Sequence, residues 1–377
     1  MPATGAQAYL GFANEPTFKL EVVGENVGTG DGTTTEFTLA NAPVMELTET
    51  VYLDGTAQTR DTDYTINYTT GAITFSTAPA SGVAITADYQ YRPSALTLVP
   101  FGVSQRVTSK TPRNNVERIF DLGSRAAVKT RALRFEGALS VEALLANEEI
   151  FEALLGSKSG AGTSGDPYVF SKSNAVKTIA VTGGFDTTSD VSNDLVGGII
   201  TRVRMATRIN EFARITVDVF YASEYVADAV ETGVLESNAP FTFVEGSVEF
   251  PSGTVVAKVQ SAEISIGTNN EAIFALNSRE AVDKFARQLD VEMRITAVAE
   301  STDLLKYAMG GDTSKRKPQD TIAENTLKFI FSDSEKTMTI TVTGAVINEI
   351  SYAIAPNELI LYDITYTAKD VQIEYYE

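Results

Sequence analysis

The chain alternates apolar and polar residues along most of its length, in short runs rich in Val, Ile, Thr, Tyr and Phe. Gly, Asn, Asp or Pro bounds these runs, and this pattern is typical of β-strands that bury one face. The clearest block lies between residues 28 and 92, with a hairpin turn expected at Thr70-Gly71. Two sets of residues there share a strand face: Tyr64, Ile66 and Tyr68, and Ile85, Ala87, Tyr89 and Tyr91. The pattern predicts a mainly β protein containing a compact antiparallel module.

Two segments instead have the apolar spacing of a short helix. In the first, Asn147 is the expected N-cap, acidic residues occupy the first turn, and Gly156 ends the helix. In the second, Ser301 is the expected N-cap and Gly310 the end. We expect each helix to be about two and a half turns long.

A ten-residue phrase occurs twice in the chain. "IFDLGSRAAV" fills residues 119–128, and "IFALNSREAV" begins 154 positions later, at residue 273. The match runs without a gap from Asn115/Asn269 to Gly156/Gly310, and both copies continue into a strand and then one of the two helices. The identical pairs in its first part are Glu117/Glu271, Ile119/Ile273, Phe120/Phe274, Leu122/Leu276, Ser124/Ser278, Arg125/Arg279, Ala127/Ala281 and Val128/Val282.

The ends of the two copies also match. The stretch from Gly197 aligns with that from Gly344, and Asn210-Glu211 and Asn357-Glu358 are the expected turns between two closing strands. Loops rich in turn-forming residues, 156–167 and 310–321, precede these hairpins. The pattern therefore predicts an internal duplication of strand, loop, strand, short helix, variable loop and terminal hairpin.

Composition narrows the possible chemistry. At 377 residues the chain is long enough for two or three domains, and it contains no Cys, His or Trp. Disulfides, thiol chemistry, imidazole or thiolate metal sites and the usual His general base are therefore excluded. The net charge of −19, from 30 basic and 49 acidic residues, argues against tight binding to nucleic acid. An acidic surface fits general solubility, a saline or hot habitat, or a passage through which a polyanion moves without sticking.

No apolar run approaches the length of a membrane helix, and the first residues lack the features of a secretory signal, so we expect the chain to fold in a cytoplasm. The glycine-rich "GTGDGTTT" from Gly28 precedes a strand and lacks a lysine, which favours a β-turn over a phosphate loop. A structural cation at Asp54, Asp61 and Asp63 is an alternative to hairpin turns there. Lys315–Lys317 is expected to meet solvent or a neighbouring carboxylate.

We expect no catalytic, cofactor or metal residues and no enzymatic activity. The repeated charges instead suggest structural roles: Arg125, Arg279, Glu117 and Glu271 are candidates for a repeated ion pair, within the chain or between subunits.

The order of several short motifs resembles the tail tube proteins of tailed bacteriophages. These are the opening "YLGFANEPTF", the strand "LTLVPF", the Asn-rich turn followed by "LGSR", the strand and short helix, and the closing hairpins from Gly197 and Gly344. The resemblance covers nearly the whole chain except residues 26–93, which look like an insertion. It implies a first tube domain from residues 1–25 and 94–235, an inserted β module at 26–93, and a second tube domain at 236–377.

The resemblance also implies β-sandwich or half-barrel domains, each with a flanking helix, that assemble into rings of six domains and stack into a tube. With two domains per chain, three chains would form one pseudo-hexameric ring, a homotrimer. The implied location is the virion tail, assembled in the host cytoplasm. The implied partners are copies of the chain, other tail proteins (tape measure, tail terminator, baseplate or tip) and double-stranded DNA, which passes through without specific binding.

Acidic residues on the wet face of such a pore would repel DNA during genome ejection, and the lumen-facing candidates are Glu136, Asp290 and Glu292. The inserted module is expected on the outside of the tube. An inner tube of a contractile injection system or gene transfer agent is an alternative. A β-sandwich surface or adhesion protein is a second alternative, which predicts monomers or sheets.

Overall fold

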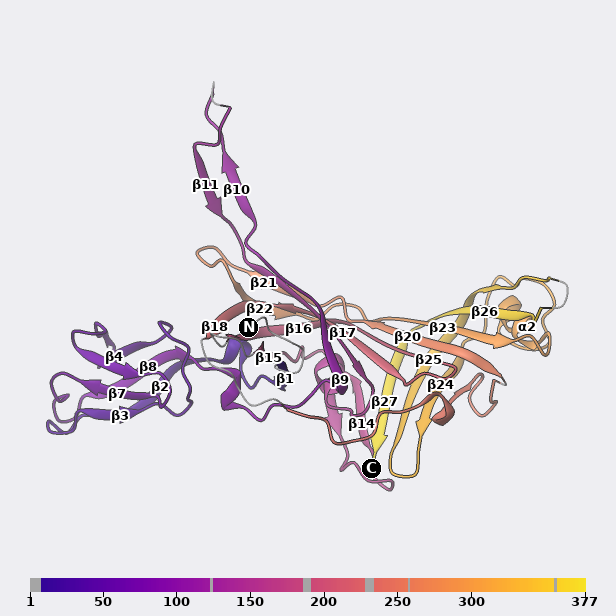
Figure 1. Cartoon of the computed structure of the whole chain (residues 1–377), viewed down its shortest axis with the longest axis horizontal. Helices are drawn as coiled ribbons and strands as arrows, with labels where there is room; N and C mark the ends of the chain where they lie inside the picture. Colours follow the sequence, from indigo (N-terminus) through magenta and orange to yellow (C-terminus); the bar gives the residue numbers. More distant parts are fainter. Residues whose placement is uncertain (1–7, 123–124, 186–190, 228–233, 257, 356–357) are drawn as a thin grey trace.

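The computed structural model of the chain describes residues 8–122, 125–185, 191–227, 234–256, 258–355 and 358–377. It is mainly β, as the alternating pattern predicts, and has a central antiparallel sheet of eight strands (Figure 1). In spatial order these strands are β9 (Val103–Arg113), β12 (Glu136–Leu144), β17 (Arg214–Tyr221), β16 (Val191–Arg208), β20 (Val259–Gly267), β23 (Asp290–Val298), β26 (Leu361–Ala368) and β25 (Thr337–Ser351).

Two long strands, β16 and β25, each take part in a second layer. The first half of β16 pairs with other strands on the N-terminal side, and the first half of β25 does the same on the C-terminal side. Gly197 and Gly344 lie where these strands pass from one layer to the other, at φ of 66° and 67°, a conformation that favours glycine. The strands of the second layers are β1 (Ala8–Asn14), β15 (Ile179–Phe185) and β18 (Ser223–Ala227), and β13 (Gly156–Ser159), β14 (Tyr168–Lys172), β19 (Gly246–Glu249), β24 (Asn325–Ser332) and β27 (Asp370–Tyr376).

The two halves of the central sheet are paired in the same way. Val141 of β12 faces Val217 of β17, and at the matching place Ile295 of β23 faces Ile364 of β26. A register shift in β16, between Ile200 and Arg202, has a counterpart in β25, between Ile347 and Glu349. One hydrophobic core runs through both halves.

The two helices begin differently from the prediction. Helix α1 (Ile150–Leu155) has Glu149 as its N-cap, without a side-chain cap. The amide of Asn147 is buried and donates to the carbonyl of Pro100 and to Glu236, so the expected capping role is wrong. Helix α2 (Asp303–Gly310) has Thr302 as its N-cap, although the Ser301 hydroxyl accepts a hydrogen bond from the Asp303 N–H at 3.2 Å.

Both helices end at a glycine in the left-handed conformation. This residue is Gly156 for α1, as predicted, but Gly311 for α2, because Gly310 is still helical. The chain returns directly into strand β13 after α1, so the first part of the expected loop 156–167 is paired with β14. Of the two predicted closing turns, Asn210 takes a φ of 63°, whereas Asn357 lies outside the described residues.

Residues 21–90 form two small sheets, whose core also includes Ala180 of β15 and Val196 of β16 (Figure 1). The face predicted from Ile85 to Tyr91 is buried, and Gly71, at φ 71°, makes the hairpin turn that was predicted there. Within the described residues these strands pair only with one another. They are β2 (Glu21–Thr29), β3 (Glu36–Thr38), β4 (Thr50–Leu53), β5 (Thr56–Ala57), β6 (Tyr64–Asn67), β7 (Ala72–Phe75) and β8 (Ala84–Gln90).

The repeated phrase lies in two β-hairpins. The first consists of β10 (Val116–Ile119) and β11 (Lys129–Ala132), and projects far from the body of the molecule (Figure 1). The second consists of β21 (Glu271–Phe274) and β22 (Ala281–Phe285). At their bases Asn115 and Asn269 both have positive φ, 42° and 52°. Their side-chain amides donate to the carbonyls of Arg134 and Gln288, at 3.2 and 3.1 Å.

Candidate assembly interface

Strands β16 and β20 join the two halves of the central sheet. The pairing runs from Arg202↔Gly267 to Arg208↔Ser261. On the core side, Val203 and Met205 face Ile266 and Ile264, and all four side chains are fully buried. On the polar side, Arg204 forms an ion pair with Glu263 at 3.2 Å. This junction is therefore a continuous β-sheet with an apolar face and a charged face.

The tip of the second hairpin adds a further contact across the same junction. The Arg279 carbonyl accepts a hydrogen bond from the Phe135 N–H at 2.6 Å, and the Arg279 guanidinium donates to the Leu133 carbonyl and to the Asn114 side chain, both at 2.9 Å. Next to it, Glu280 binds the Lys19 ammonium at 3.3 Å. The hairpin from one half of the chain is thus fastened to the other half.

Arg125, the counterpart of Arg279, lies at the exposed tip of the first hairpin. Among the described residues it forms no hydrogen bond or ion pair, and Gly123 and Ser124 beside it lie outside those residues. Phe120 is 56% exposed, whereas its counterpart Phe274 is partly covered by the Arg134 guanidinium, 5.3 Å from the ring centre. The first hairpin therefore has a sequence similar to that of the second but lacks its contacts.

The four candidate ion-pair residues are not brought together within the chain. Arg279 binds carbonyl and amide oxygens, and Glu271 instead pairs with Arg287 at 2.6 Å. Glu117 is exposed on β10 and forms no ion pair in the described part of the chain. An ion pair of Arg125 or Glu117 between subunits stays a prediction.

The outer strands of the central sheet, β9 and the second half of β25, have free edges among the described residues. Val107 on β9 and Tyr352 and Ile354 just after β25 are 45%, 51% and 74% exposed. Arg113 and Glu349 on the same two edges have no ion-pair partner in the described structure. An unpaired edge that carries exposed apolar side chains is a template for pairing with another chain.

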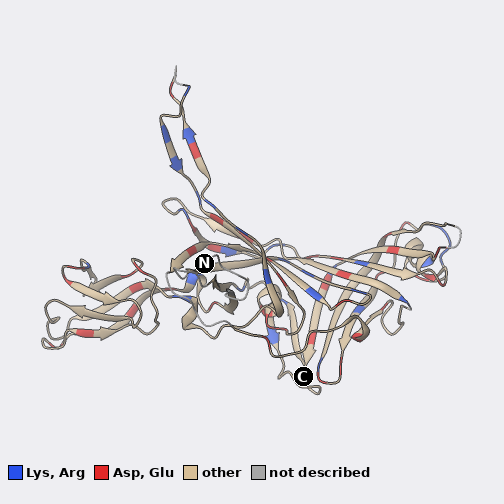
Figure 2. Cartoon of the chain, in the orientation of Figure 1, with Lys and Arg blue, Asp and Glu red and all other residues tan. Residues whose placement is uncertain are grey.

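The three lumen candidates lie in polar surroundings. Asp290 and Glu292 line a polar groove of about 500 Å³ with Arg202, Arg204 and Arg294 on the wet face of the central sheet. Glu136 forms an ion pair with Arg134 at 2.9 Å and accepts a hydrogen bond from Asn115 at 2.8 Å. Figure 2 shows Lys and Arg beside Asp and Glu along the strands of this sheet, and the residues that line the groove carry both signs of charge.

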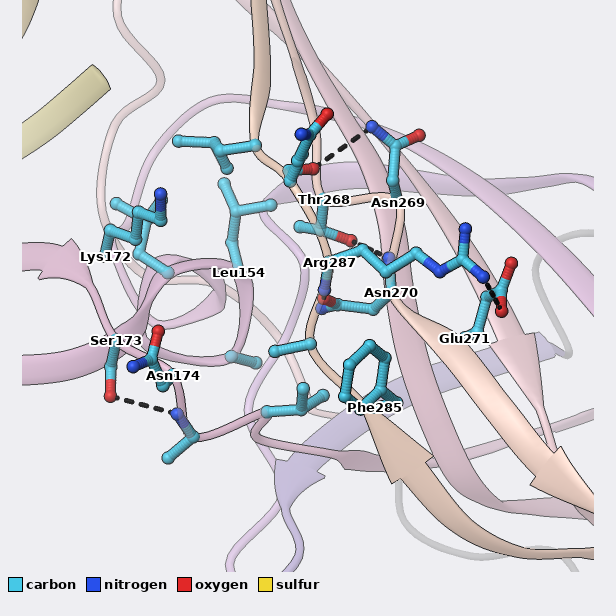
Figure 3. Close-up of a pocket in the computed structure, with 17 residues that line it drawn as sticks. Leu154, Lys172, Ser173, Asn174, Thr268, Asn269, Asn270, Glu271, Phe285 and Arg287 are labelled. Carbon is cyan, nitrogen blue, oxygen red and sulfur yellow. Dashed lines mark hydrogen bonds and ion pairs between the residues drawn. The ribbon is translucent and has the colours of Figure 1, made fainter. Parts of the chain in front are cut away.

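A larger pocket of about 770 Å³ lies at the base of the second hairpin (Figure 3). One wall comes from Leu154 and Leu155 of α1 and the segment 172–176, and the other from residues 268–271 and 285–289. Asn269 and Asn270 brace the second wall, because each bonds across to the chain that leaves the hairpin. Its titratable residues are Lys172, Glu271 and Arg287, and the last two form an ion pair at 2.6 Å.

The other candidate motifs have structural roles. Asp31, in the glycine-rich stretch, accepts hydrogen bonds from the N–H groups of Thr33 and Thr34, which lower its pKa and close a turn. The carboxylates of Asp54 and Asp63 accept N–H bonds from Ala84 and Thr59. Within the described ranges no group of three or more acidic residues could hold a metal ion, and no helix there is long and apolar enough to cross a membrane.

Buried charged groups are the features that sequence patterns did not reveal. Glu15 accepts hydrogen bonds from the N–H groups of Gly197 and Lys19, and burial raises its pKa to about 7. Arg92 pairs with the fully buried Asp194 at 2.6 Å. Each joins segments distant in sequence, which no local pattern marks.

No protein-family model matches the chain, and a search of curated proteins gives no match. The geometry of the sheet junction and of the free edges is therefore the basis for inferring a function.

Proposed function

We propose that this protein is the major tail tube protein of a tailed virus, with two tandem tube domains per chain. Three chains close into a pseudo-hexameric ring, and stacked rings form the conduit through which the genome leaves the capsid. The proposal depends chiefly on one observation: the central sheet has an internal junction between its halves and two free edges where the same junction can be repeated.

The matching registers of the two halves define the contact between copies. The position of Ile350 on β25 corresponds to that of Val203 on β16, and Pro112 on β9 corresponds to Ile266 on β20. Copying the β16–β20 junction therefore pairs Ile350 of one chain with Pro112 of the next. Within a single chain Pro112 lies on an edge strand, where proline is tolerated, and at the proposed junction it has no N–H to donate to the neighbour.

Charge and apolar surface support the same register. Glu349 falls opposite Arg113 of the next copy, an ion pair on the polar side. Tyr352 and Ile354, now exposed, occupy the positions of Met205 and Thr207, which are buried in the internal junction. Ring closure would therefore cover the exposed apolar side chains at this edge and remove both open edges.

The wet face of the sheet suits a pore for DNA. Its acidic residues, which include Asp290 and Glu292, alternate with arginines, while the whole chain has a net charge of −19. A polar surface with nearby charges of both signs has no continuous positively charged strip that would bind DNA phosphates. The inserted module extends from the end of the molecule (Figure 1), which suits a position on the outside of a ring.

Electron microscopy of the purified protein tests this function. The expected result is rings, or hollow rods of stacked rings, with three chains in each ring. Six chains per ring would refute the stoichiometry. A protein that stays monomeric, or forms flat sheets, under all conditions would refute the tube and favour the adhesion alternative.

The proposed contact is tested by charge reversal on the two edges. Glu349→Arg and Arg113→Glu should each weaken ring formation, because like charges then face each other, and the double variant should restore it. Arg208→Glu is the control, because Arg208 is exposed on the inner strand β16 and forms no ion pair among the described residues. If both single variants form rings at the wild-type concentration, the proposed register is wrong.

A further inference from the structure

The pocket at the base of the second hairpin has a counterpart in the first half of the chain that is already occupied. Asn114, Leu133 and Phe135, at the base of the first hairpin, hold the tip of the second hairpin through Arg279. The residues 154 positions further on are Thr268, Arg287 and Leu289. All three line the pocket in Figure 3.

The tip that would fit this pocket is present in the chain but makes no such contact. Arg125 has the same place in the repeated phrase as Arg279, and it is exposed at the end of a projecting hairpin. Ala281 is fully buried beside the docked tip, whereas its counterpart Ala127 is only partly buried. The Leu289 N–H, counterpart of the bonded Phe135 N–H, has no hydrogen-bond partner among the described residues.

We infer that the pocket binds the tip of the β10–β11 hairpin of a second copy of this chain, with Arg125 in the role that Arg279 has within the chain. This inference builds on the proposed ring. In the docked state the Arg125 carbonyl accepts from the Leu289 N–H of the neighbour, and its guanidinium donates to the neighbour's Arg287 carbonyl.

The direction of docking agrees with the sheet edges. Within one chain, the second half contributes β20 to the junction. The same half contributes the β21–β22 hairpin, whose tip binds the first half. At the proposed junction between copies, the chain that contributes β9 would contribute the β10–β11 hairpin. The projecting hairpin and the free edge would therefore bind the same neighbour, and their contacts would reinforce each other.

Engineered cysteines test the docking directly, because the chain has no native cysteine. In Phe135→Cys/Arg279→Cys the two backbones are hydrogen-bonded, so a disulfide within one chain is expected. In Arg125→Cys/Leu289→Cys the same geometry should link different chains. Oxidised samples on a non-reducing gel should show covalent dimers and trimers for the second pair and only monomer for the first.

Mixing two single-cysteine variants distinguishes crosslinks that form by docking from those that form by random collision. Arg125→Cys and Leu289→Cys single variants, oxidised alone, should stay largely uncrosslinked, and their mixture should give a dimer. Arg125→Ala should raise the protein concentration needed for half-assembly by about tenfold or more, through loss of hydrogen bonds from a charged donor. Arg118→Ala, on the exposed flank of the same hairpin, is the control and should change it less than about twofold.

The outcomes distinguish this inference from the tube itself. Rings that form while the Arg125→Cys/Leu289→Cys pair gives no crosslink between chains would overturn the docking inference and leave the ring proposal standing. A wild-type protein that never forms rings would overturn the ring proposal on which the inference rests. Crosslinks between chains together with rings would support both.

Discussion

Replacing Arg92 with Met tests the contact that fastens the inserted module to the body of the protein. The Arg92 Nε atom lies 2.6 Å from the Asp194 carboxylate, whose side chain is fully buried. The other oxygen of that carboxylate accepts a hydrogen bond from the Thr182 hydroxyl at 2.7 Å. In Arg92→Met the hydroxyl remains, but the buried negative charge loses its cation.

The structure sets the size of the expected loss. Removing one partner of a buried ion pair costs about 3–5 kcal/mol. We therefore expect Arg92→Met to lower the free energy of unfolding by about 3–5 kcal/mol.

Urea unfolding, followed by circular dichroism or tyrosine fluorescence, measures this loss. Arg204→Met is the matched control, because its ion pair with Glu263 is about 40% exposed on both sides and should contribute less than about 1 kcal/mol. If Arg92→Met costs no more than the control, the buried ion pair does not stabilise the fold as proposed.

Two further predictions concern the strand crossings and a buried acid. Gly197→Ala should destabilise the chain by about 2–4 kcal/mol, because a Cβ there would lie 2.7 Å from the Ala222 Cβ in addition to the left-handed strain. Gly344→Ala should cost only about 1–2 kcal/mol, because its Cβ meets the flexible Lys369 side chain; equal urea midpoints for the two variants would contradict this. Burial raises the folded-state pKa of Glu15 to about 7, so its contribution to stability is greatest below the unfolded pKa and is lost as pH rises through 7. Between pH 5 and pH 8, wild type should therefore lose about 2–3 kcal/mol of unfolding free energy relative to Glu15→Gln, and parallel pH profiles would refute this.

Local and repeated features of the protein were predictable from its sequence. The alternation of apolar and polar residues predicts strands, because successive side chains of a strand point to opposite faces. The buried face from Ile85 to Tyr91 was predicted correctly in this way. The repeated phrase with Arg125 and Arg279 predicted two equivalent elements, and both are hairpins. The end of α1 was also predictable, because a helix stop at Gly156 depends on the backbone freedom of one residue.

The N-cap of α1 shows where local reasoning fails. Asn147 has the right residue type in the right place, but its amide is used by Pro100 and Glu236, which are distant in sequence. Tertiary contacts of this kind compete with a cap that is worth only about 1 kcal/mol. The buried charged residues Glu15, Arg92 and Asp194 could not be predicted for the same reason. Whether a side chain is buried depends on segments that are distant in sequence and pack over it.

The sequence by itself determined the β character, the repeat and the absence of thiol and imidazole chemistry, because these depend on residue types and their spacing. Only the tertiary structure decided which edges are free and which are paired. Residues 119–128 and 273–282 are nearly identical, yet one hairpin is docked and the other projects into solvent. The physical reason is position in the sheet: the second hairpin has another half of the same chain beside it, whereas the first is at the outer edge.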